Sequence, residues 1–331
     1  AFPYVPRLVT VNAGMAMEST VMACNRLCGS AMQAIISVAQ AIRLGDAEIG
    51  LAGGVELMSA GGYLSPAMRN GARMGDTKML DMMVAALTDP FGAGHMGMTA
   101  ENQAAKWGIS REEQDAFALV SQQRAAQAIA EGRFASQIVP ITLKTRKGEV
   151  VFDTDEHPRA TTLEALAKMK PAFKKEGGTV TAGNASGIND GAAFLVLADG
   201  EAAARGQNKP MARLVAQAVA GVEASVMGDG PIPAVQLALK RAGLSLDQID
   251  VIEANEAFAA QALAVAKGLG LDPVKTNPNG GAIALGHPVG ATGAVIVTKL
   301  LHEMQRTGAR YGLATMCIGG GQGIATIWER C

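Results

Sequence analysis

Residues 24–33, Cys-Asn-Arg-Leu-Cys-Gly-Ser-Ala-Met-Gln, place a cysteine where an apolar strand expected over 19–24 meets a long apolar helix expected over 29–44. Because that helix is apolar on nearly every face, we expect it to be enclosed on all sides. The free N–H groups and the positive dipole end of its first turn favour a thiolate over a thiol. We therefore expect Cys28 to be a nucleophile. The alternative is a small buried hydrophobic residue, which is how most free cysteines behave.

The composition is that of a large soluble globular protein, with 331 residues of which 49% are hydrophobic and 18% charged. Lys and Arg (29) balance Asp and Glu (30) without a long basic run, so nucleic acid and anionic membranes are poor candidate partners. No apolar stretch of membrane-spanning length is free of Gly, Pro or charge, so no membrane span is expected. Four cysteines in a chain of this length make no disulfide framework, which favours a reducing compartment such as the cytoplasm.

Strands and helices alternate through the second half of the chain in the order βαβαβαββ, which predicts a layered α/β fold. The pattern predicts strands at 211–220, 249–254, 309–317 and 323–329, helices at 233–242, 256–269 and 288–306, and a short segment at 274–278.

The region around Cys28 repeats the end of this order, with strands expected at 48–53 and 191–197. Cys28 and His287 therefore occupy matching corners of two pseudo-repeats. The segment before Cys28 is about fifty residues shorter than the corresponding segment before His287, which begins at the strand expected from residue 211. We therefore expect the natural protein to begin earlier, with a βαβ segment.

An insertion rich in Gly, Met and Pro, at about 60–185, separates the strands at 48–53 and 191–197, and a helix is expected within it at 111–131. Such insertions are typically lids or binding subdomains. Its stretch 89–99 has the glycines of a backbone that approaches a ligand closely, although plain loop flexibility explains them equally well.

Four short motifs lie where a strand ends and a helix or tight turn begins, which is where ligands gather in α/β sheets. They are Cys28-Gly-Ser, Asn255-Glu-Ala-Phe258, Gly286-His-Pro288 and Cys317-Ile-Gly-Gly-Gly321. The glycine turn after Cys317 offers free N–H groups of the kind that an oxyanion hole needs, although an ordinary hairpin after a buried cysteine is the alternative.

Nucleotide and metal sites lack their usual patterns. No Gly-x4-Gly-Lys-Ser/Thr motif occurs, and Cys24-x3-Cys28 without a nearby His/Cys pair is poor zinc spacing. We expect no metal site.

These motifs, in this order and spacing, strongly resemble the thiolases, and the bacterial β-ketothiolase and acetyl-CoA acetyltransferase branch in particular. The resemblance extends across nearly the whole chain and includes Arg73-Met-Gly-Asp76, His95-Met-Gly97 and Thr179–Asp190. It implies the thiolase fold: two pseudo-repeated βαβαβαββ halves in a five-layer α-β-α-β-α core with an inserted loop domain. The expected domains are 1–59 plus 186–207 for the N-terminal half, 60–185 for the inserted coenzyme A-binding loops and 208–331 for the C-terminal half.

The resemblance also implies the chemistry, a reversible Claisen condensation of acetyl-CoA with acyl-CoA through an acyl-cysteine, without metal or redox cofactor. Cys28, activated by His287, would carry the acyl group, and Cys317 would move the α-proton. Asn255 would position a water that holds the enolate together with His287, and the N–H groups of Cys28 and Gly319 would hold the oxyanion. Contacts to coenzyme A are implied for Ser186, Ala182, Gly183, Arg159 and the tunnel walls His95, Met96, Leu87, Ala257 and Phe258.

Two other functions fit the same resemblance less well. A decarboxylating condensing enzyme would be expected to present a histidine where Cys317 stands, and an acyl-CoA or lipid carrier would not need the intact set of four catalytic side chains. Family members are dimers or dimers of dimers, so a homodimer or homotetramer is implied, with the segment near 62–80 as a candidate tetramer contact.

Overall fold

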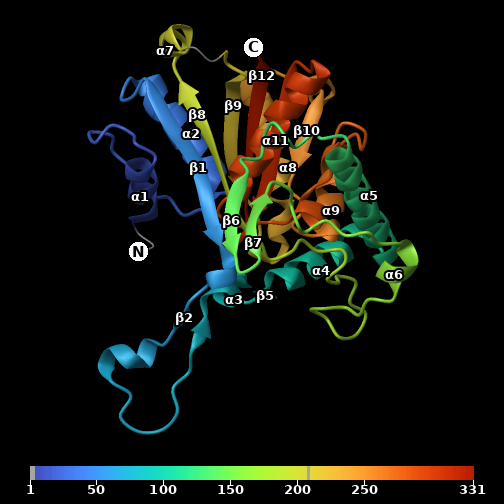
Figure 1. Ribbon diagram of the computed structural model, residues 1–331. Coiled ribbons are helices and arrows are strands. Elements are labelled where there is room, and N and C mark those ends of the chain that lie inside the picture. The colour runs from blue at the N-terminus through green and yellow to red at the C-terminus, as the bar shows by residue number, and fades with distance from the viewer. Residues whose placement is uncertain (1–3, 207–208) are drawn as a thin grey trace.

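The computed structural model describes residues 4–206 and 209–331, whose body is built on two β-sheets with helices between and outside them (Figure 1). The larger sheet has the strand order β10-β11-β12-β9, in which only the β10–β11 pair is parallel. The smaller sheet is the antiparallel pair β1–β8. The bounds are β1 Ile49–Leu57, β8 Asp190–Ala198, β9 Ala212–Gly221, β10 Val251–Ala254, β11 Tyr311–Ile318 and β12 Gln322–Arg330.

Two helices, α2 (Ser30–Leu44) and α11 (Thr292–Thr307), lie between the sheets and contact each other. Their buried faces share one hydrophobic cluster with both sheets, so this central layer joins the two halves of the fold. The two helices pack closely, because a Cβ on Gly293 of α11 would collide with the backbone of Met32 in α2. Cys28 and His287 each lie a few residues before one of these two helices, as the pseudo-repeat predicts.

The outer face of the larger sheet is covered by α8 (Pro231–Ala242) and α9 (Ala259–Leu269), which contribute to a second hydrophobic cluster. The order of layers is therefore outer helices, larger sheet, central helices and smaller sheet. The outer face of the smaller sheet carries exposed apolar side chains, among them Phe194 and Val196, the latter 72% exposed.

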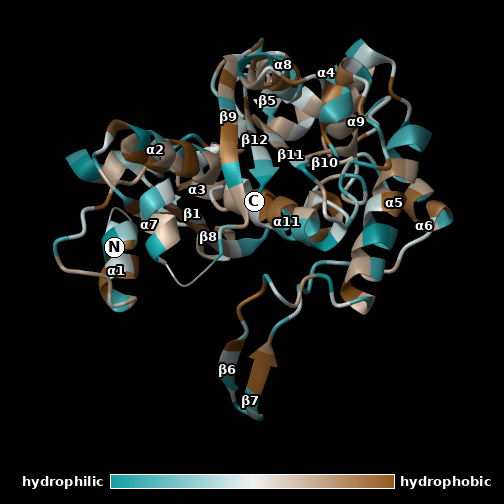
Figure 2. Cartoon of the chain, turned by 90° about the horizontal axis from the view of Figure 1, so that it is seen from above, coloured by the Kyte–Doolittle hydropathy of each residue, from teal (hydrophilic) through white to brown (hydrophobic). Residues whose placement is uncertain are grey.

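The insertion between β1 and β8 contains the helices that approach the C-terminal half, while two of its hairpins project outward (Figures 1 and 2). Its elements are η2 Met58–Ala60, β2 Tyr63–Leu64, η3 Pro66–Asn70, β3 Leu80–Asp81, α3 Met82–Ala86, β4 Thr88–Asp89, β5 Gly94–His95, α4 Met96–Trp107, α5 Arg111–Ala130, β6 Ile141–Thr145, β7 Gly148–Phe152 and α6 Leu163–Ala167. The remaining elements are α1 Val5–Asn12, α7 Gly200–Arg205, η4 Ala224–Asp229, η5 Leu246–Gln248 and α10 Ala282–Leu285.

Most predicted elements are confirmed within a few residues, but the strand expected at 19–24 is wrong. That segment is irregular, because within the described chain no strand lies beside it to accept its backbone hydrogen bonds. The prediction that the helix after Cys28 is enclosed on all sides is also wrong, since α2 buries one face and Leu44 is 78% exposed. The segment 274–278 forms only one isolated bridge, from Thr276 to Ile252.

In the described chain, one helical window, Leu27–Leu44, is long and apolar enough to cross a membrane. It contains α2, whose apolar face packs in the central layer of the core. The predicted domain limits stay a prediction, and the boundary at 207 and 208 lies outside the described residues.

Candidate active site

Cys28 is presented by a tight turn that the motif builds from its own side chains. Asn25 Oδ1 accepts a hydrogen bond from the Leu27 N–H (2.9 Å), and Ser30 Oγ accepts from the Arg26 N–H (2.9 Å) and donates to the Leu27 carbonyl (2.7 Å). Leu27 has φ +48°, a left-handed conformation that costs a non-glycine residue about 1–2 kcal/mol. The turn therefore holds a strained residue directly before the cysteine, with Gly29 as the N-cap of α2.

Cys28 is half-buried, and its thiol lies beside the backbone N–H of Gly319. Burial raises the pKa of Cys28 to about 11, and the nearby N–H groups of Gly319 and of Cys28 itself offset only part of that rise. The expectation that the helix start favours a thiolate is therefore wrong for the resting protein, because desolvation exceeds the effect of the N–H groups. A base is needed to ionise this thiol.

Cys317 lies at the end of β11, with no exposed surface, and enters the glycine turn 319–321. Gly320 (φ +78°) and Gly321 (φ +86°) adopt left-handed conformations, and a Cβ on Gly321 would collide with the Val222 carbonyl. Burial raises the pKa of Cys317, and a thiolate on the neighbouring Cys28 would raise it further. The turn thus brings a second thiol and the Gly319 N–H to the first thiol.

Asn255 and His287 bring buried polar atoms that have no partner within residues 4–206 and 209–331. These unpaired atoms are Oδ1 and Nδ2 of Asn255 and Nε2 of His287. His287 Nδ1, in contrast, lies 2.6 Å from Thr292 Oγ1. Burial lowers the pKa of His287 to about 4, so the imidazole is neutral at pH 7. Because an unpaired buried polar group costs about 1–3 kcal/mol, these atoms are suited to a polar reactant.

The loop that carries His287 is held at both ends by side chains from the N-terminal half. Asn189 Oδ1 accepts from the His287 N–H (3.2 Å), and Glu56 Oε2 accepts from the Gly290 N–H (2.8 Å). Gly290 also lies close to β1, because a Cβ on Gly54 would collide with its carbonyl. The position of the imidazole therefore depends on both halves of the fold.

The insertion contributes an apolar wall next to the thiols. Met96, Ala257, Phe258 and Cys317 share one buried cluster, against which Leu87 packs. His95 stacks on Phe173 with 4.8 Å between ring centroids, and Phe173 meets Phe258 edge to face at 6.2 Å. A Cβ placed on Gly319 would lie 3.5 Å from the Met96 sulfur, so Met96 packs close to the glycine turn. The wall thus reaches from the insertion to the glycine turn.

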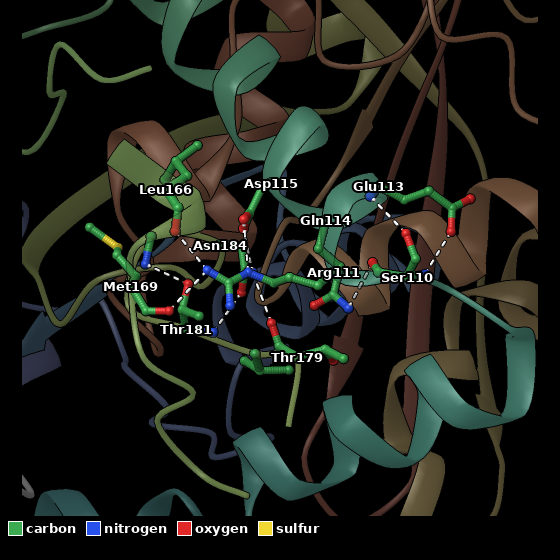
Figure 3. Close-up of polar contacts among 12 residues, drawn as sticks. Ser110, Arg111, Glu113, Gln114, Asp115, Leu166, Met169, Thr179, Thr181 and Asn184 are labelled. Atoms are coloured by element: carbon green, nitrogen blue, oxygen red, sulfur yellow. Dashed lines mark hydrogen bonds and ion pairs between the residues drawn. The ribbon is translucent and has the colours of Figure 1, made fainter. Parts of the chain in front are cut away.

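The loop 179–186 is fastened from two sides (Figure 3). Asn184 donates to Asp115 Oδ1 of α5 (2.9 Å) and accepts from the Thr181 N–H (2.8 Å), while Asp115 is paired with Arg111 at 2.8 Å. On the other side, the Ser186 N–H donates to the Ala257 carbonyl (3.0 Å). Ser186 is therefore set against the strand-like segment that follows Asn255.

Two family models together match nearly the whole chain. The family model described as "Thiolase, N-terminal domain" matches residues 3–201, and "Thiolase, C-terminal domain" matches residues 208–330. The chain belongs to the thiolase family. Beta-ketothiolase BktB of Cupriavidus necator is 57% identical over 328 residues, covering 99% of this chain and 83% of that protein. An acetyl-CoA acetyltransferase of Syntrophomonas wolfei is 54% identical over 330 residues, covering 98% and 83%.

Solved thiolase structures have the same fold. Human mitochondrial 3-ketoacyl-CoA thiolase matches with a TM-score of 0.97 at 48% identity, covering 99% of this chain and 83% of that chain. The same human protein in complex with CoA matches with a TM-score of 0.95 at 47% identity. The resemblance to the thiolases and the thiolase fold that it implies are therefore confirmed.

In this thiolase the predicted site residues fall into two groups. Cys317 packs in the wall that contains Met96, Leu87, Ala257 and Phe258, and the Gly319 N–H lies beside the Cys28 thiol. Arg159, by contrast, is exposed, and its N–H donates to Gln122 of α5 at 2.9 Å. Arg159 lies two residues after His157, whose ring packs on Gly187 beside Ser186.

Sequence reasoning missed the residues that hold the others in place: Glu56, Asn189, His157, Phe173 and Thr292. Asn189 lies within the quoted motif 179–190, and His157 is one of only four histidines in the chain, so both offered a signal. Among the residues described, no group of three or more His, Cys, Asp or Glu side chains is arranged to hold a metal ion.

Proposed function

We propose that this thiolase catalyses the reversible Claisen condensation of acetyl-CoA with an acyl-CoA, forming acetoacetyl-CoA or cleaving short 3-ketoacyl-CoA by thiolysis. The observation that carries the proposal is the pair of neighbouring desolvated thiols, Cys28 and Cys317, with the Gly319 N–H beside the first. Two thiols suit this reaction, because an acyl-cysteine conserves the thioester energy and keeps the exchange reversible. Relatives named acetyl-CoA acetyltransferase and beta-ketothiolase support it.

The first half-reaction transfers an acyl group to Cys28. Neutral His287 takes the thiol proton through Nε2, and the thiolate attacks the thioester carbonyl of the donor acyl-CoA. The N–H groups of Cys28 and Gly319 hold the oxyanion, and each such donor lowers the barrier by about 3 kcal/mol. The coenzyme A thiolate then leaves with a proton from Cys317, so a Cys317 thiolate remains near an imidazolium, whose charge offsets the raised pKa of that thiol.

The second half-reaction forms the carbon–carbon bond. The Cys317 thiolate takes a proton from the α-carbon of acetyl-CoA, and the enolate oxygen is held by His287 and by a water that Asn255 positions. The α-carbon attacks the acyl carbonyl, and Cys28 leaves as a thiolate that recovers its proton from His287. Protons and charge balance over the cycle without a change of oxidation state.

Because the reaction exchanges thioesters, we propose that coenzyme A and acyl-CoA are substrates and that no resident cofactor takes part. The wall of His95, Met96, Leu87, Ala257 and Phe258 would enclose the pantetheine arm, with Ala182, Gly183 and Ser186 as its polar contact. Arg159, which is exposed, would meet the nucleotide end.

We also propose a cytoplasmic homodimer or homotetramer. The segment 62–80 projects from the body, and its Met74 is 98% exposed, which suits a contact between dimers (Figure 1). Light scattering of the protein with this segment shortened to a Gly-Ser turn should give a smaller assembly than the full chain.

Labelled acetyl-CoA tests the proposed chemistry. After digestion, acetyl on Cys28 is expected, and the absence of label from every cysteine would refute the proposal. The Cys317→Ala variant should still accept acetyl on Cys28 and fail to form acetoacetyl-CoA. Cys331→Ala, which removes an exposed cysteine, is the matched control and should turn over normally. Normal turnover by Cys317→Ala would contradict the role of that thiol.

A further inference from the structure

A buried chain of polar contacts leads from His287 away from its unpartnered Nε2. His287 Nδ1 lies 2.6 Å from Thr292 Oγ1, and the same Oγ1 lies 2.8 Å from the carbonyl oxygen of Pro288. Thr292 is the first residue of α11, so its hydroxyl reaches back to the carbonyl four residues earlier. Both His287 and Thr292 are buried. The position of the proton on each side chain is therefore set by the other side chain and not by solvent.

The geometry assigns one proton to each of these contacts. A carbonyl oxygen cannot donate, so the proton between Thr292 and Pro288 is that of the threonine hydroxyl. The hydroxyl then offers only lone pairs to His287, and Nδ1 must carry the proton of the 2.6 Å contact. If Thr292 donated to a bare Nδ1 instead, two oxygen atoms would face each other at 2.8 Å without a proton between them.

The Pro288 carbonyl is also the acceptor of the turn that begins α11. It receives the backbone N–H groups of Ala291 (2.9 Å) and Thr292 (2.8 Å). The oxygen that receives the threonine proton is therefore fixed by the backbone, and it cannot rotate to relieve the alternative arrangement.

We propose that Thr292 is a positioning residue that holds His287 as the Nδ1–H tautomer and so leaves Nε2 bare to act as the base for Cys28. The inference rests on the proposed function, which assigns His287 to that proton transfer. The tautomer of an imidazole is set by the partner of its other nitrogen. A neutral hydroxyl, unlike a carboxylate, orients the ring without adding a negative charge that would hold a proton on it.

Three variants test the proposal: Thr292→Val, which keeps the shape and removes the hydroxyl, Thr292→Ser, which restores the hydroxyl, and Thr298→Val. Thr298 is on the same helix, and its Oγ1 is buried without a partner among the described residues, so it is the matched control. The readouts are the single-turnover rate of Cys28 acetylation, the KM for acetyl-CoA and a thermal melt of each protein.

Thr292→Val should acetylate Cys28 about 10–100-fold more slowly than the Thr298→Val control, with KM changed less than about threefold, because only the base is affected. Thr292→Ser should recover most of the rate. A Thr292→Val rate equal to that of the control overturns the proposal, and so does a Thr292→Ser rate as low as that of Thr292→Val.

A direct measurement keeps the proposal testable if Thr292→Val does not fold. Nitrogen-15 NMR of the unaltered protein, labelled at histidine and assigned with a His287→Gln variant, distinguishes a protonated Nδ1 from a protonated Nε2. The Nδ1–H form is expected, and an Nε2–H form overturns the proposal. This spectrum does not depend on turnover. Failure of acetylation in the unaltered protein would refute the proposed function, whereas the wrong tautomer would refute only the role of Thr292.

Discussion

Replacing Lys299 with methionine removes the cation of a buried ion pair under the active site. Lys299 Nζ lies 2.8 Å from Glu253 Oε2 and 2.7 Å from the Gly280 carbonyl, and both charged side chains are buried. Glu253 Oε1 has no hydrogen-bond partner within the described chain. The variant therefore leaves a carboxylate in the core without a counter-charge, which typically costs 3–5 kcal/mol, here about 4 kcal/mol of unfolding free energy at pH 8.

The loss of unfolding free energy in Lys299→Met should depend on pH. Burial raises the pKa of Glu253 from 4.5 to about 7, against the opposing effect of Lys299. Because the folded state binds this proton more tightly than the unfolded chain, the stability it contributes is greatest below pH 4.5 and falls as pH rises toward 7. Without Lys299 the pKa rises further. The destabilisation of the variant should therefore shrink by up to about 1.4 kcal/mol for each pH unit as the solution is acidified from the variant's higher pKa to about pH 7. Below pH 7 it should change little, because the carboxyl is then protonated in both folded proteins.

Urea unfolding of the unaltered protein and of Lys299→Met at pH 5.5 and pH 8 measures both quantities. A second variant, Glu253→Gln with Lys299→Met, removes the stranded charge and should recover at least half of the loss at pH 8. Equal destabilisation at the two pH values, or no recovery in the double variant, would refute the reasoning. Since Glu253 lies two residues before Asn255, the single variant should also lower kcat.

Two further predictions concern the central layer and the nucleophile. Gly293→Ala should cost about 1–3 kcal/mol of unfolding free energy because its Cβ would collide with the Met32 backbone, whereas Gly200→Ala, where nothing lies within 4 Å, should be neutral; equal melting temperatures for the two variants would argue against this contact. Alkylation of Cys28 by iodoacetamide should rise about tenfold per pH unit from pH 7 to 9, because its pKa is raised to about 11; a plateau in that range, measured on the Cys28 peptide by mass spectrometry, would contradict a neutral resting thiol.

Elements whose signals are local could be predicted from the sequence. The helix predicted at 111–131 is α5, Arg111–Ala130, because Ser110 and Glu113 form a capping box at its start. The helix after Cys28 ends where predicted because Gly45 adopts φ +80° as its C-cap. The strand expected at 19–24 failed, because a strand exists only where a neighbour supplies hydrogen bonds, and no local pattern reports that neighbour.

The residues of the candidate site also divide into those that the sequence could predict and those that it could not. The motif residues Cys28, Asn255, His287 and Cys317 could be named from the chain alone, because each stands in a motif where a strand was expected to end and a helix or tight turn to begin. The residues that hold them could not, since Glu56 and Asn189 reach the His287 loop only after both halves of the fold have packed together.

The sequence by itself determined that the chain is a thiolase, and it predicted which thiols and which imidazole carry the chemistry, because those signals are carried by residue type and spacing. Only the tertiary structure decided the state of these groups. Whether Cys28 rests as a thiol or a thiolate depends on desolvation against two N–H groups, one of them from Gly319 at the far end of the chain. Burial and the proximity of distant segments arise on folding, and they set the pKa of Cys28 against the expectation from its helix.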